Sequence, residues 1–195
     1  MSLRIRDKWR QDGKAASLED SAAAAAYASW QIALAATKNL HAENFEYRDD
    51  HQRLGVLREY LIFLSHIADR LVFEHMELSD RERFVTSFTK ESARQLQRNA
   101  EEILGPRDYQ SQLIELLGIR NRDYSQYPAN RGCPGYGMLR AFGENVQQWM
   151  DSNQTNRWVI DQVIEIDGPE AAIALKQAID HLLETAKDND LAPLC

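Results

Sequence analysis

Between residues 54 and 75, apolar side chains recur at intervals of three and four, and this run constrains the fold more than any other feature. Such spacing places the side chains on one stripe of an α-helix, as where the helices of a bundle touch. The stripe consists of Leu54, Leu57, Leu61, Leu64, Ala68, Leu71 and His75. The apolar surface is widened by Ile62, Phe63, Ile67, Val72 and Phe73. A helix that is apolar over most of its circumference is normally enclosed by others, so we predict that residues 45–76 form the central helix.

Helical spacing also governs the rest of the chain, whereas strand patterns are nearly absent. A first helix is expected from Ser17 to about Leu40, because Ser17 and Asp20 match the capping pattern of a helix N-terminus. Its alanine face can pack closely on another helix, either inside the chain or across a symmetric dimer. This face contains Ala22, Ala26, Ala33 and Ala36. Further helices are expected over about 80–104, 108–119, 138–149 and 155–166, and a last one from Pro169, with Asp167 and Gly168 separating the final two.

Together these elements predict an all-α fold, a single-domain bundle of six or seven helices within residues 17–187. Residues 1–16 form a basic N-terminal segment that we expect to lie outside this domain, with disorder as one interpretation. Residues 188–195 are expected to form a frayed C-terminal tail.

A long irregular loop is predicted over residues 121–137, where helical periodicity stops. The loop holds two prolines, three glycines and three tyrosines, including Tyr127, and arginines such as Arg131 make it locally basic. Long ordered loops often serve as lids or binding edges. Alternatively, the prolines fold this segment back over the core and the tyrosines fill the space beneath it.

Four ionisable residues interrupt the apolar central helix. Glu59, His66 and Arg70 are seven and four positions apart, so they share one face, and Asp69 borders it. An unpaired buried charge costs several kcal/mol, so these groups must meet water, each other, a neighbouring helix or a ligand. One interpretation is a paired polar seam between helices. The other is the wall of a pocket that, with Tyr127 and Arg131, binds a small anionic molecule.

Charge and composition narrow the range of partners. The chain of 195 residues has a formal net charge of −7, which disfavours nucleic acid, since phosphate neutralisation drives most of that affinity. The longest uncharged apolar run, residues 60–68, is about half the length of a membrane-spanning helix, so no membrane partner is expected. Cys133 and Cys195 are the two cysteines and form no disulfide framework, which favours a soluble protein of the cytoplasm.

The sequence predicts no metal and no cofactor. His66 precedes Asp69 by three residues, and His181 precedes Glu184 in the same way, but the Glu-x-x-His order of di-iron bundles does not occur. No local pattern marks a nucleophile with its base. We therefore favour a non-catalytic protein that binds a protein partner or assembles with itself, as in a homodimer. The alternative is an enzyme or receptor for a small anionic molecule, and whether the chain is an enzyme stays open.

Overall fold

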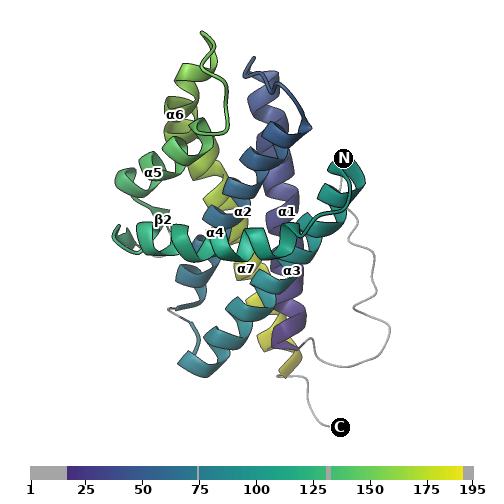
Figure 1. Ribbon diagram of the computed structural model, residues 1–195. Coiled ribbons are helices and arrows are strands. Elements are labelled where there is room, and N and C mark those ends of the chain that lie inside the picture. Colours follow the sequence, from purple (N-terminus) through teal and green to yellow (C-terminus); the bar gives the residue numbers. More distant parts are fainter. Residues whose placement is uncertain (1–16, 74, 131–132, 191–195) are drawn as a thin grey trace.

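Long helices dominate the computed structural model, which describes residues 17–73, 75–130 and 133–190 (Figure 1). In chain order the helices are α1 (Leu18–Ala42), α2 (Asp50–Phe73), α3 (Leu78–Leu104), α4 (Tyr109–Tyr124), α5 (Tyr136–Gln147), α6 (Val159–Gln162) and α7 (Gly168–Asp190). A two-residue ladder pairs β1 (Ala129–Asn130) with β2 (Cys133–Pro134) in antiparallel register. The prediction of an all-α single-domain bundle is confirmed.

Helix α2 occupies the centre of the bundle, as the apolar stripe predicts. It contacts α1, α3, α4, α5 and α7, and its buried residues cover most of its circumference. Every stripe residue within the helix is buried, whereas His75 follows the helix end and is exposed. The helix is shorter than the predicted 45–76, because Asn44 adopts a left-handed backbone with φ 67° and the chain turns before Asp49 caps the first turn of α2.

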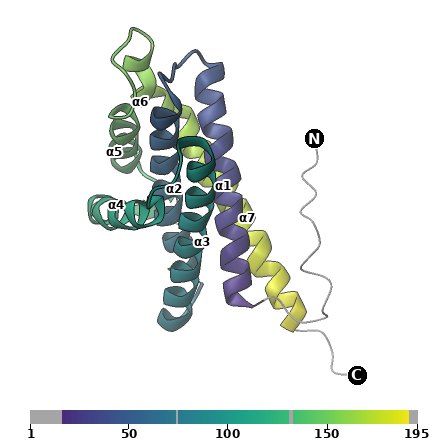
Figure 2. The ribbon, with the colours of Figure 1, turned by 45° about the vertical axis from the view of Figure 1, so that its right-hand side comes forward.

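Helix α1 begins at the predicted capping box. Ser17 and Asp20 exchange side chain-to-backbone hydrogen bonds, both 3.1 Å long. The alanine face is an internal contact: Ala22, Ala26 and Ala33 are fully buried, and α1 packs on α2, α3 and α7. Figure 2 shows α1 and α7 running side by side along one flank of the bundle. This face is therefore not a surface for a second copy, and the homodimer stays a prediction.

The irregular segment is shorter than predicted. Helix α4, which crosses in front of the upright helices in Figure 1, continues to Tyr124, and α5 already begins at Tyr136. Tyr124 explains the extension, because its fully buried ring packs edge-on against Phe63 with centroids 6.3 Å apart and anchors the last turn of α4. The 121–124 stretch lacks aliphatic residues, so periodicity alone misses this turn.

The predicted break before the last helix does not occur. A π-helical turn, Val163–Asp167, joins α6 directly to α7, and Gly168 stays in the right-handed helical conformation. A Cβ on Gly168 would lie 2.7 Å from the Val163 carbonyl oxygen, so the wide turn needs glycine here. At the other end α7 includes positions 188–190 of the expected tail, and residues 1–16 and 191–195 lie outside the described part of the chain.

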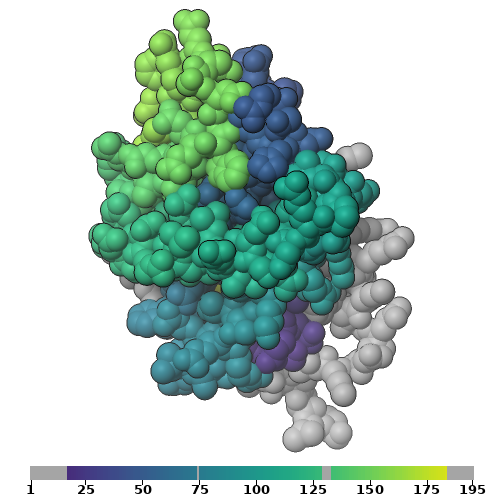
Figure 3. All heavy atoms as spheres, in the orientation of Figure 1, coloured from purple at the N-terminus to yellow at the C-terminus, as the bar shows by residue number. Residues whose placement is uncertain are grey.

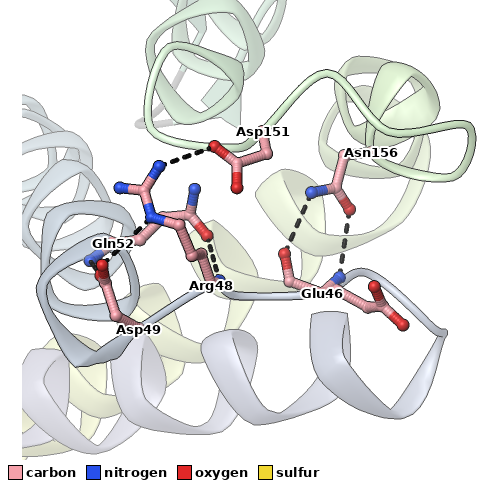
Figure 4. Close-up of polar contacts among 6 residues, drawn as sticks. All are labelled: Glu46, Arg48, Asp49, Gln52, Asp151 and Asn156. Carbon is pink, nitrogen blue, oxygen red and sulfur yellow. Dashed lines mark hydrogen bonds and ion pairs between the residues drawn. The ribbon is translucent and has the colours of Figure 1, made fainter.

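A buried amide holds the α1–α2 connection against the segment between α5 and α6 (Figure 4). The Asn156 side chain accepts a hydrogen bond from the Glu46 backbone N–H at 3.1 Å and donates one to the Glu46 carbonyl at 3.0 Å. Nearby, Arg48 donates to Asp151 at 3.1 Å. These contacts fix the segment that carries Trp149 beside the N-terminal half of α2.

Candidate functional site

The first group of the polar stripe is centred on Glu59, which is 0% exposed. Arg120 of α4 donates two hydrogen bonds to its carboxylate, from Nε at 3.1 Å and from Nη2 at 3.2 Å. The Trp149 indole N–H donates a third at 3.2 Å. A buried carboxylate tolerates burial when a bidentate guanidinium and a further donor satisfy it. Glu59 therefore joins α2 to α4 and to the segment after α5.

The second group consists of His66 and Arg70. Arg70 Nε donates to His66 Nε2 at 2.7 Å, and since a guanidinium has no acceptor, Nε2 must be unprotonated. The imidazole proton then lies on Nδ1, which donates to Asn121 Oδ1 at 3.2 Å. Burial and the adjacent Arg70 lower the pKa of His66 to about 4. His66 is therefore neutral near pH 7, and its ring is an acceptor for Arg70.

Arg70 also closes the C-terminal end of α4. Its Nη2 donates to the carbonyl oxygens of Tyr124 at 3.0 Å and Tyr127 at 2.7 Å. Asp69 forms a separate pair, accepting from Arg81 Nε at 2.7 Å and Nη2 at 2.8 Å, which links α2 to α3. These contacts use arginine forks as cross-links between helices.

The predicted site residues thus fall into neighbouring networks rather than around one open cavity. Glu59, His66, Asp69 and Arg70 each have a partner on α3, α4 or the segment after α5. Tyr127 joins through its backbone carbonyl, while its ring lies against Gly137. Arg131 lies outside the described residues. This pairing favours the polar seam over the pocket wall, and a ligand-binding role for these residues stays a prediction.

Sequence reasoning missed a second site, a crevice of about 40 Å³ beside the polar stripe. It lies where the N-terminal half of α2, the C-terminal half of α3 and the start of α4 meet Trp149. The Arg58 guanidinium lies 4.8 Å from the centroid of the Trp149 ring. The centroid of the His51 ring lies 5.9 Å from the same Trp149 centroid. Arg58 Nε is buried and has no hydrogen-bond partner in the part of the chain that the structure describes. One signal was available, since a glycine inside an apolar helix indicates a close neighbour.

Gly55 is what lets the Trp149 indole approach the α2 backbone. A Cβ at this position would lie 2.1 Å from the indole Cε3 atom, so the ring would have to move. We expect Gly55→Ala to lower the free energy of unfolding by about 2 kcal/mol, because overpacking outweighs the helix propensity gained. Gly118→Ala is the matched control. Gly118 is exposed on α4, an added Cβ would meet no described atom within 4 Å, and the substitution should stabilise the fold by about 0.5–1 kcal/mol. Urea denaturation measures both, and equal effects would contradict the packing argument.

A buried acid lies apart from both sites, at the end of the π-helical turn. Asp167 is 4% exposed, and its Oδ2 atom has no hydrogen-bond partner within residues 17–73, 75–130 and 133–190. Burial raises the pKa of Asp167 to about 6. The hydroxyl of fully buried Tyr60 likewise has no hydrogen-bond partner among these residues, and burial with the nearby Asp167 charge raises the pKa of Tyr60. Asp167 is thus half-protonated near pH 6 in the folded chain, whereas an Asp in the unfolded chain is ionised at this pH. Folding therefore raises the proton occupancy of this carboxyl group.

Comparison with known proteins gives no matching family model, no matching curated protein and no matching solved structure. Within residues 17–73, 75–130 and 133–190, no three His, Cys, Asp or Glu side chains gather as a metal site would require. The described helices include none with the length and hydropathy needed to cross a bilayer.

Proposed function

We propose that this chain is a non-catalytic cytoplasmic protein that binds a protein partner. In this proposal the polar networks of α2 form an internal framework, since Glu59, His66 and Asp69 are held by Arg120, Arg70 and Arg81. Groups held in this way are poorly placed to exchange protons with a substrate. In this proposal the partner is recognised by the protein surface, and the polar networks of α2 keep that surface rigid.

The observation that carries the proposal is the composition of the crevice around Arg58. Trp149, Tyr109 and Arg58 line it, and these residue types dominate the energetic centres of protein interfaces. Its volume of about 40 Å³ is far below the roughly 300–1,000 Å³ of small-molecule sites. A crevice of this size accommodates the end of one partner side chain rather than a whole metabolite.

A second candidate function is a receptor for a small anionic molecule, and one depression supports it. This depression, of about 400 Å³, lies between the end of α1 and the start of α2. Lys38, His41 and Arg53 line it, but Asp49 and Asp50 line it as well, and Arg53 is paired with Asp50 at 2.8 Å. The mixed charge makes this depression the weaker site for an anion.

Hydrogen exchange of the purified chain tests the two functions against each other. The chain is measured with peptides containing acidic, basic or neutral residues, and separately with a panel of anionic metabolites. Partner binding predicts that at least one peptide protects residues 51–58 and 96–112, which flank the crevice. Protection only at residues 37–53, with a raised melting temperature in the metabolite panel, would favour the receptor instead. Light scattering over a concentration series shows whether a second copy is itself the partner.

A further inference from the structure

We propose that the crevice lined by Arg58 and Trp149 is a carboxylate-binding site, which receives an Asp or Glu side chain of the protein partner. The proposal rests on the proposed function and names the chemistry of the partner. In the space-filling view, the crevice-forming segments of α2, α3 and α4 and the residues after α5 meet on the face shown in Figure 3.

Arg58 carries a buried hydrogen-bond donor that no described residue uses. Among the described residues, its buried Nε atom has no hydrogen-bond acceptor and its guanidinium forms no ion pair. By contrast, Arg81 and Arg120 each bind a carboxylate through two nitrogens. A buried guanidinium donor without an acceptor is costly, and a carboxylate supplies two acceptor atoms in the matching geometry.

The charges around the crevice also favour an anion. Glu59 follows Arg58 in the chain, but its two oxygens are already used by Arg120 and by the Trp149 N–H. Arg58 and Arg120 against Glu59 leave one positive charge at the crevice. Burial lowers the pKa of Arg58, which agrees with a partly desolvated cation, but a guanidinium stays protonated in proteins. The crevice therefore carries one positive charge that a negatively charged group of a partner would neutralise.

The crevice is also rigid and small enough to fit a carboxylate closely. The Trp149 ring is held between the bare backbone of Gly55 and its hydrogen bond to Glu59, so one wall of the crevice is fixed. Leu54, Leu96 and Ala100 make the other walls apolar, and such surroundings strengthen a charge pair. A free volume of about 40 Å³ suits the few heavy atoms of a carboxylate group. Rigid donors in an apolar recess discriminate an anion from its neutral isostere.

The test compares labelled Gly-Gly-Glu-Gly-Gly-amide with its Gln counterpart, both N-terminally capped, by fluorescence anisotropy. We expect the Glu peptide to bind at least about tenfold more tightly, with affinity falling as salt increases. Arg58→Gln should remove this preference, whereas Arg122→Gln, an exposed arginine of α4, should leave it intact. Thermal melting of Arg58→Gln serves as the folding control, and we expect an unchanged or higher melting temperature because a desolvated charge is removed.

Sodium acetate tests whether the carboxylate group alone is sufficient for binding. If acetate displaces the Glu peptide at concentrations where chloride does not, the site accepts free carboxylates as well as side chains, which supports the proposal. Equal affinity for the Glu and Gln peptides, or a preference that survives Arg58→Gln, would overturn it. If neutral peptides bind and protect the crevice equally in the wild type and in Arg58→Gln, the partner-binding function is supported and the carboxylate assignment fails. Binding of no peptide and no acetate would overturn both.

Discussion

Arg120→Met is expected to lower the free energy of unfolding by about 3–5 kcal/mol. The substitution removes both guanidinium donors from Glu59, which is 0% exposed, and leaves the Trp149 N–H as the remaining donor to its carboxylate. A buried charge without its counter-ion is among the largest single destabilisations known in proteins. Urea denaturation at pH 7, with the midpoint and slope analysed together, measures the loss.

Two controls separate the lost ion pair from general damage. Arg122→Met changes an exposed arginine on the same helix and should alter stability by less than about 0.5 kcal/mol. The double variant Glu59→Met/Arg120→Met removes both charges and should recover most of the stability lost in Arg120→Met, because apolar pairs often replace buried ion pairs at little cost. A double variant as unstable as Arg120→Met would show that lost packing, not the unpaired charge, is responsible.

The central helix could be predicted because its information is local. Alternating spacings from Leu54 to Leu71 are a property of consecutive residues, and so are the caps at Ser17 and Asp108, which both form as their sequences indicate. The partners of the polar stripe could not be predicted in the same way. Arg120 is 61 positions from Glu59, and nothing in helical spacing distinguishes it from Arg122.

The crevice around Arg58 and Trp149 was not predicted for the same physical reason. Arg58 looks like an ordinary polar residue of a helix, and only the fold shows that Trp149, 91 positions later, covers it. The predicted break at Gly168 was wrong for a related reason. Asp-Gly-Pro usually ends a helix, and the sequence alone does not show that the chain continues. Here the missing Cβ permits a π-helical turn that carries the chain into α7. Local rules therefore describe the elements well, whereas contacts between distant elements decide which residues are available for function.

Acid is expected to destabilise the protein through His66. The pKa of His66 is about 4 in the folded chain and near the ordinary 6.5 in the unfolded one. Between these pH values His66 binds a proton in the unfolded state but not in the folded state. Its contribution to the free energy of unfolding, which is fully present above pH 6.5, is therefore lost as the pH falls toward 4. Protonation would place two cations 2.7 Å apart, because Arg70 Nε donates to His66 Nε2. The loss amounts to about 2–3 kcal/mol.

His66→Gln isolates this contribution, because the amide oxygen of Gln can still accept from Arg70 while the side chain does not titrate. We expect the wild type to lose about 2 kcal/mol more than His66→Gln between pH 7 and pH 4.5, measured by urea denaturation at each pH. Asp167 acts in the opposite direction, since its pKa of about 6 makes folding more favourable as the pH falls below 6. Its contribution is common to both proteins and cancels in their difference, and Asp167→Asn in each background verifies this cancellation. Parallel pH profiles for the wild type and His66→Gln would mean that the pKa of His66 is the same in the folded and unfolded states. The imidazole would then be neither buried nor held by Arg70 as described, and the polar seam would be open to solvent.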